Sequence, residues 1–150
     1  MTMKRRIFGN MLLLALVSIL LISALFSVII SRQLTEDMRR ELQNQMAYAM
    51  AGYRQGGMDY LTDITGEDRQ SRITLIGEDG RVHFDSRADA ESMENHKDRP
   101  EVRAARETGK GEAIRRSDTL DSQFFYVARL LEDGQILRVS SQTATVAAIL

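Results

Sequence analysis

The sequence contains no cysteine, no tryptophan and a single proline, Pro100, in 150 residues. Without cysteine the chain can form no disulfide and offers no thiol for catalysis or metal binding. It also lacks an excess of basic residues. Three of its 20 Lys and Arg precede residue 7, which leaves 17 against 21 Asp and Glu from Arg32 onward, a charge of −4. A nucleic-acid partner is therefore excluded for this part, because phosphate backbones require a basic face.

One segment lacks charge altogether: the 25 residues from Ile7 to Ser31. A helix needs about 20 apolar residues to cross the hydrocarbon of a bilayer, so the sequence predicts a transmembrane helix over 7–31. The alternative is a cleaved signal peptide, whose apolar core is about 7 to 15 residues long and ends at a small-x-small site. Here Ser23-Ala24-Leu25 is followed by further apolar residues. This favours an uncleaved anchor in the lipid bilayer.

The distribution of charge around this segment predicts its orientation. Residues 1–6 carry Lys4-Arg5-Arg6, and basic residues beside a membrane helix stay in the cytoplasm. Residues 1–6 are therefore expected to form a cytoplasmic tail and 32–142 an extracytoplasmic domain. The end of the chain, 143–150, is apolar again and is expected to begin a second membrane helix of a longer protein.

After the anchor, apolar residues recur every three or four positions from Leu34 to Tyr53, which predicts that the membrane helix continues outward. Gly56-Gly57 is expected to end it, and a short helix should follow up to Gly66. The apolar stripe suits packing on a sheet, and it equally suits a seam between two copies of the chain in a homodimer.

From Arg72 the apolar period changes to two, the period of a strand. Five strands are predicted, at 72–76, 82–85, 112–117, 123–131 and 135–141, with Asp-Gly hairpin turns after the first and fourth. The strand at 123–131 is the most apolar and is expected at the centre. A helix is predicted to begin after Asp98, with Asp98 as its cap and Glu101 completing a capping box, and to end at Gly109. The fold class is α+β, an antiparallel five-stranded sheet with helices on one face.

The stretch from Asp85-Ser86 through Met93-Glu94-Asn95-His96 to Arg99-Pro100-Glu101 resembles the extracytoplasmic sensor domain of PhoR-like sensor histidine kinases of Gram-positive bacteria. The resemblance covers roughly 72–142 and implies a PAS-like or Cache-like fold. It also implies a second membrane helix, of which 143–150 would be the start, and, after it, a HAMP-type linker and a dimeric kinase core, which are expected beyond this chain. ATP, Mg and a cognate response regulator are expected only for that absent core.

Two groups of residues are candidate sites. Five arginines could gather around a small-molecule or ionic ligand, since a guanidinium fork suits carboxylate and phosphate; the alternative is a solvated face paired with glutamates. The second group is the resemblance loop, interpreted as structural, with Asn95 and His96 bonded to loop backbone rather than to a metal. The arginines are Arg99, Arg103, Arg106, Arg115 and Arg116, and the loop residues are Asp85, Met93, Asn95, His96 and Pro100.

No catalytic motif is recognisable, so neither catalysis nor a cofactor is expected in this chain. A proton-sensing role for His83 or His96 stays open, because imidazole titrates near neutral pH. The leading hypothesis is the input region of a membrane-bound two-component sensor histidine kinase. The alternatives are the sensor region of a chemoreceptor or cyclic-dinucleotide enzyme, and a non-signalling single-pass envelope protein.

Overall fold

The structure, a computed structural model, describes residues 3–64, 71–116 and 123–142, and it divides the chain into two compact units, 1–37 and 38–150. Helix α1 (Met3–Asp63) supplies all the described residues of the first unit. Its large apolar side chains from Ile7 to Ile29 are exposed, and one 18-residue window has a mean hydropathy of 3.0. By length and composition this helix is able to cross a bilayer.

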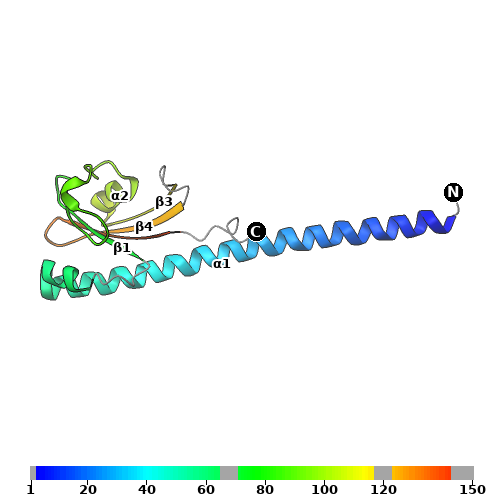
Figure 1. Cartoon of the computed structure of the whole chain (residues 1–150), viewed down its shortest axis with the longest axis horizontal. Coiled ribbons are helices and arrows are strands. Elements are labelled where there is room, and N and C mark those ends of the chain that lie inside the picture. Colours follow the sequence, from blue (N-terminus) through cyan, green and yellow to red (C-terminus); the bar gives the residue numbers. More distant parts are fainter. Residues whose placement is uncertain (1–2, 65–70, 117–122, 143–150) are drawn as a thin grey trace. The chain divides into compact units, whose positions relative to one another are not determined.

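The second unit is built on one antiparallel sheet with the strand order β2-β1-β5-β4-β3 (Figure 1). The predicted α+β class and the five strands are confirmed. Short turns at Gly80 and Gly134 join two of the hairpin pairs, and both glycines have the positive φ that such turns require. The bounds are β1 Arg72–Ile76, β2 Val82–Asp85, η1 Ala90–Ser92, α2 Pro100–Thr108, β3 Lys110–Arg116, β4 Gln123–Leu130 and β5 Ile136–Gln142.

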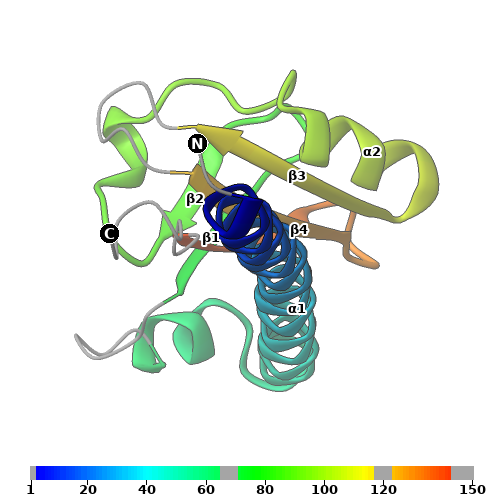
Figure 2. The same ribbon diagram turned by 90° about the vertical axis from the view of Figure 1, so that its right-hand side faces the viewer.

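Helices cover both faces of this sheet, and the prediction of one covered face was wrong. On one face Leu42, Met46 and Ala49 of α1 pack against odd-numbered residues of β1, β4 and β5. On the other face Val102 and Ala105 of α2 pack against Ile76, Ala128 and Ile136. Figures 1 and 2 show the sheet lying between α2 and the part of α1 in the second unit. Side chains alternate along a strand, so both faces need a cover.

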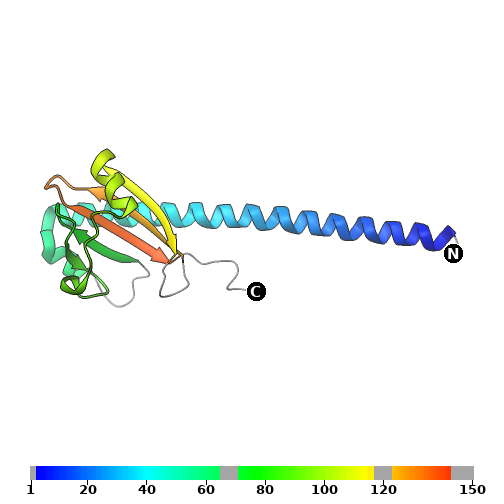
Figure 3. The ribbon, with the colours of Figure 1, turned by 90° about the horizontal axis from the view of Figure 1, so that it is seen from above.

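The central strand is β5, whereas the sequence predicted β4 for this place. The first five residues of β5 are all buried, but only three of the eight in β4 are. Two of those buried β5 residues, Arg138 and Ser140, are polar. They lower the hydropathy of β5, so the hydropathy of the sequence does not identify β5 as the central strand. The strands of the sheet are seen from above in Figure 3.

The ends of the helices differ in part from the predictions. As predicted, helix geometry breaks at Gly57 (φ 58°, ψ −140°), and α1 resumes up to Asp63. Helix α2 begins at Pro100 with Arg99 as N-cap and no side-chain cap, so the predicted Asp98 cap was wrong. Its end at Gly109 (φ 81°) was predicted correctly. Gly66, Ser117 and the apolar end at 143–150 lie outside the described residues.

Candidate ligand-binding pocket

A pocket of about 270 Å³ opens on the side of the sheet that carries α2. Strands β1, β3, β4 and β5 each contribute one side chain to it. The pairing register puts these four side chains on the same face of the sheet, because side chains alternate between the two faces along each strand. The loop before α2 supplies the rest. We call it the arginine pocket, and its lining residues are Arg72, Met93, Glu94, His96, Arg99, Arg115, Tyr126 and Arg138.

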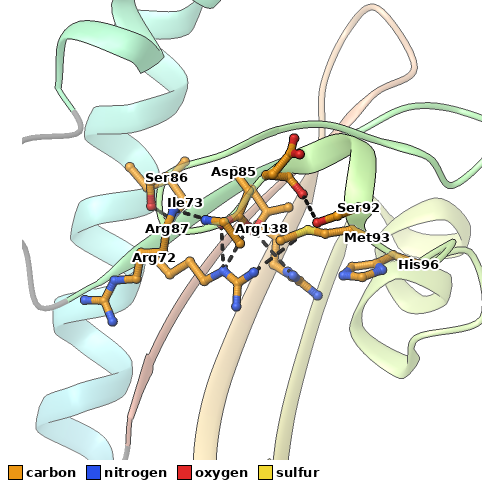
Figure 4. A network of polar contacts seen from close by, with 12 residues as sticks. Arg72, Ile73, Asp85, Ser86, Arg87, Ser92, Met93, His96 and Arg138 are labelled. Atoms are coloured by element: carbon orange, nitrogen blue, oxygen red, sulfur yellow. Dashed lines mark hydrogen bonds and ion pairs between the residues drawn. The ribbon is translucent and has the colours of Figure 1, made fainter.

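Arg72 is held by Asp85 on the neighbouring strand. Its Nε lies 2.9 and 2.8 Å from the two carboxylate oxygens of Asp85, whose side chain is fully buried. Thr74 donates a further hydrogen bond of 2.8 Å to the same carboxylate. Figure 4 shows this network beside Arg138, with Met93 and His96 approaching from the loop. The pair fixes Arg72 at one wall of the pocket and largely neutralises its charge.

A second carboxylate, Glu101 in the first turn of α2, lies beneath the pocket and holds two more arginines. Its Oε1 accepts hydrogen bonds from Arg115 at 2.8 Å and from Arg138 at 3.2 Å. Its Oε2 has no partner among the described residues. Glu101 is fully buried and Arg138 nearly so. One carboxylate thus faces two guanidinium groups, and the cluster retains a positive charge.

Tyr126 supports these two arginines from β4. The guanidinium carbon of Arg115 lies 4.1 Å from the centre of the Tyr126 ring, and that of Arg138 lies 5.2 Å from it. A cation over the face of an aromatic ring is attracted by the ring's quadrupole. The ring therefore adds to the attraction by which Glu101 holds both arginines in place.

The charges around the pocket do not balance. Four arginines face two buried carboxylates, Asp85 and Glu101, and a third, Glu94, which is 89% exposed and lies 3.8 Å from Arg99. Burial lowers the pKa of Arg138, and the charge of Glu101 opposes that shift. Guanidinium nevertheless stays protonated in proteins. A buried positive charge without a full counter-charge favours binding of an anion.

The loop before α2 is fixed by bonds to backbone. Asn95 donates to the Asp79 carbonyl at 2.9 Å and accepts from the Lys97 N–H at 2.8 Å. The Nδ1 of His96 lies 2.7 Å from the Glu94 carbonyl oxygen. Burial, followed by the positive charge of Arg138, lowers the pKa of His96 below its usual 6.5. His83, by contrast, is exposed and contacts Gln135.

The structure separates the five arginines singled out from the sequence. Arg99 and Arg115 line the pocket. Arg103 is exposed and does not line the pocket, and Arg106 donates to the Gly77 carbonyl at 2.8 Å. The side chain of Arg116 lies outside the described residues. Of the loop residues, Met93 and His96 line the pocket, Asp85 holds Arg72, Asn95 bonds to backbone and Pro100 starts α2.

Sequence reasoning missed Arg72, Arg138 and Tyr126. A signal for them existed: Arg138 interrupts the apolar run of β5 at an inward position, and a charge at such a position requires a partner. The pairing register then places Arg138 opposite Thr74 and Ala128. That register depends on the strand order, which the sequence did not provide.

A larger hollow of about 450 Å³ lies at the edge strand β3. It is lined by three cations, Arg39, Lys110 and Arg129, and by one carboxylate, that of Glu112, which lies 3.1 Å from Arg39 and accepts from Gln43 at 2.9 Å. These charges are more exposed than those of the arginine pocket: 40% of the Arg39 side chain and 30% of the Glu112 side chain are open to solvent, against 4% for Arg138 and none for Glu101. We therefore consider the arginine pocket the better ligand site despite its smaller volume. Among the described residues no three His, Asp or Glu side chains gather in a way that would hold a metal ion.

A long N-terminal helix followed by a five-stranded antiparallel sheet with helices is consistent with a PAS/Cache-like α+β fold. The family model described as Single Cache-like matches residues 31–142, and the chain belongs to this family. The domain is therefore a Cache-type sensor domain, an input module.

Comparison with solved structures finds a crystal structure of the extracellular domain of rpHK1S-Z16, a protein named as a histidine kinase. The identity is 15% and the TM-score 0.41, and the similarity covers 56% of this chain. The chain spans only about a third (34%) of that structure's length. No protein of curated function matches.

Proposed function

We propose that this chain is the signal-input region of a membrane-bound, PhoR-like two-component sensor histidine kinase, and that it detects a small anion outside the cytoplasm. The kinase core, which would use ATP and Mg and act on a response regulator, is not part of this sequence. The observation that carries the ligand proposal is the arginine pocket, with four guanidinium groups and two buried carboxylates.

Membership of the Single Cache-like family supports the sensing role. The apolar segment of α1 supports membrane attachment, since it is long enough to cross a bilayer. Three basic residues at the N-terminus support a cytoplasmic N-terminus and an extracytoplasmic sensor domain. In this proposal the ligand shifts the domain between two packings, and α1, which packs on the sheet through Leu42 and Met46, passes the shift to the membrane.

The orientation is tested by cysteine labelling. The chain has no native cysteine, so only the introduced cysteine can react. Gln55→Cys places a thiol on an exposed position of the sensor domain, and Met3→Cys places one before the apolar segment. A membrane-impermeant maleimide added to intact cells should label Gln55→Cys and leave Met3→Cys unlabelled until the cells are lysed. The reverse pattern would overturn the proposed orientation, and a chain released into the medium would overturn the anchor.

Anion binding is tested on the purified full-length chain in detergent, with small carboxylates and inorganic phosphate as probes. A ligand that binds only the folded state raises its melting temperature. Arg99→Gln removes one guanidinium from the pocket, and Arg103→Gln removes one from an exposed position on α2. We expect the first variant to lose the shift and the second to retain it. An equal response in both variants would place the binding elsewhere.

The link to a kinase is tested at the gene. The reading frame should continue past Leu150 into a second apolar segment and a phosphoacceptor histidine with an ATP-binding domain. A continuation into a chemoreceptor or cyclic-dinucleotide domain would retain the sensor and replace the output.

A further inference from the structure

His96 presents the arginine pocket with a hydrogen-bond acceptor whose protonation is set by geometry. Its Nδ1 lies 2.7 Å from the backbone carbonyl oxygen of Glu94. A carbonyl can only accept, so Nδ1 must carry the hydrogen. In the neutral imidazole the other nitrogen, Nε2, then has a free lone pair and acts as an acceptor.

The surroundings of His96 fix the position of its backbone and favour the neutral form of its ring. The N–H of His96 donates to the Gly80 carbonyl at 2.8 Å, and its own carbonyl accepts from the Arg99 N–H at 3.1 Å. Burial and the charges of Arg138 and Arg99 lower the pKa of His96, whereas the Glu94 carbonyl and the charge of Glu101 act in the opposite direction. The net shift favours the neutral ring at neutral pH.

Nε2 is available to a ligand. Within the described part of the chain the His96 ring makes a single hydrogen bond, which is that of Nδ1. The atoms that are both inaccessible to solvent and without a partner do not include Nε2, so this nitrogen can be reached from the pocket. His96 also lines the pocket. The four arginines around it can only donate hydrogen bonds. Besides the solvated carboxylate of Glu94, the lining offers a ligand donor two charge-free side-chain acceptors of the oxygen or nitrogen type, the Tyr126 hydroxyl and His96 Nε2, and of these only Nε2 carries no hydrogen of its own.

On the premise that the arginine pocket binds an anion, as proposed above, we propose that its ligand is a small hydroxycarboxylate. The carboxylate accepts hydrogen bonds from the guanidinium edges of Arg99 and Arg115, and the hydroxyl donates to His96 Nε2. An ammonium group would also supply a donor. It would, however, bring a further positive charge close to four guanidinium groups, so a hydroxy acid fits this pocket better than an amino acid.

The test compares probes that differ in one group. Lactate, propionate and alanine share a three-carbon skeleton and carry a hydroxyl, a hydrogen and an ammonium group beside the carboxylate; malate and succinate form a second pair. Binding is measured by calorimetry on the full-length chain in detergent at pH 7.5. One neutral hydrogen bond corresponds to roughly a threefold to tenfold gain in affinity, so we expect that advantage for lactate over propionate and for malate over succinate.

A spectroscopic measurement tests the role of His96 without a variant that might fail to fold. The chain contains two histidines, so ¹⁵N-labelling of histidine gives few signals, and His83 serves as an internal reference. A hydrogen bond accepted by Nε2 moves its ¹⁵N resonance. We expect lactate to move the His96 Nε2 signal and leave His83 in place, and propionate to leave both in place.

The outcomes separate the two proposals. Equal affinity within both pairs, tighter binding of alanine than of lactate, or an unmoved His96 signal with lactate bound would overturn the inference and leave the anion site intact. Failure of all five probes to bind the native chain would overturn the hydroxycarboxylate assignment. Failure of phosphate and the other carboxylates as well would overturn the proposed anion-binding function itself.

Discussion

Glu101 and Arg138 form a buried ion pair that joins the first turn of α2 to the central strand β5, with Oε1 and Nη1 3.2 Å apart. Arg115 of the edge strand β3 binds the same oxygen at 2.8 Å. A single carboxylate therefore connects a helix to two strands that do not neighbour each other in the sheet. Because both side chains of the pair are almost fully removed from solvent, neither can be rehydrated if the other is lost.

We expect Glu101→Ala to destabilise the sensor domain strongly. The substitution leaves Arg138 buried without its counter-charge, and breaking a buried ion pair from one side costs about 3–5 kcal/mol. Urea unfolding of the full-length chain in detergent, followed by circular dichroism, measures the change. Glu107→Ala is the matched control, because Glu107 lies on the same helix and is exposed. A similar, small effect of both substitutions would show that the pair contributes little.

Most of the fold was predictable, because the period of apolar residues identifies helices and strands locally. The alternation of Ile73 and Leu75 with Thr74 and the turn at Gly80 sufficed for the first hairpin. The arrangement of the strands was not predictable in this way. Both the central place of β5 and the second covered face depend on contacts between distant segments, which a single sequence does not record.

The candidate site was predictable only in part, for the same reason. Arg99 and Arg115 were selected because a guanidinium fork suits carboxylate and phosphate, and Arg103 and Arg106 were selected on the same ground. In the structure Arg99 and Arg115 line the pocket, whereas Arg106 bonds to the Gly77 carbonyl and Arg103 is exposed. Arg72 and Arg138 are far apart in the sequence and become neighbours of the site only through strand pairing. The predicted capping box was wrong for a similar reason, since Glu101 is engaged by two arginines from distant strands.

We expect Tyr53→Phe to destabilise the domain by about 1 kcal/mol, the usual net value of a hydrogen bond. The Tyr53 hydroxyl lies 3.2 Å from the Asp133 carboxylate and accepts from Gln135 at 3.0 Å, so it ties α1 to the turn between β4 and β5. Tyr48→Phe is the control, because Tyr48 on the same helix is 74% exposed. Thermal unfolding should show a lower melting temperature for Tyr53→Phe and not for Tyr48→Phe. Equal melting temperatures of the two variants would show that the hydrogen bonds of Tyr53 do not stabilise the domain.

Gly111 should tolerate no side chain. A Cβ built there would lie 1.9 Å from the carbonyl oxygen of Glu101, so Gly111→Ala must move α2 away from β3. Overpacking of this kind costs about 1–3 kcal/mol. Gly9→Ala is the control, because its added methyl meets nothing within 4 Å. A lower urea midpoint is expected for Gly111→Ala only. If the variant is as stable as the native chain, α2 does not pack this closely on β3.

The stability of the domain should fall on the acid side of neutrality because of His96. Burial and the charge of Arg138 hold its pKa in the folded state below the value of 6.5 that it has when unfolded. Between these two values the unfolded chain binds more protons than the folded chain, so stability decreases as the pH falls. About one unit above pH 6.5 both states are almost entirely neutral, and this contribution no longer changes.

The contribution of His96 is isolated by comparing the native chain with His96→Gln from pH 7.5 to pH 5. Other groups titrate in the same range, but they do so in both proteins and cancel in the difference of their melting temperatures. That difference should level off toward pH 7.5 and should move in favour of the variant as the pH falls from there, because glutamine takes up no proton. A shift in favour of the native chain at low pH would mean that the imidazolium is stabilised in the fold, which contradicts its burial beside Arg138 and Arg99.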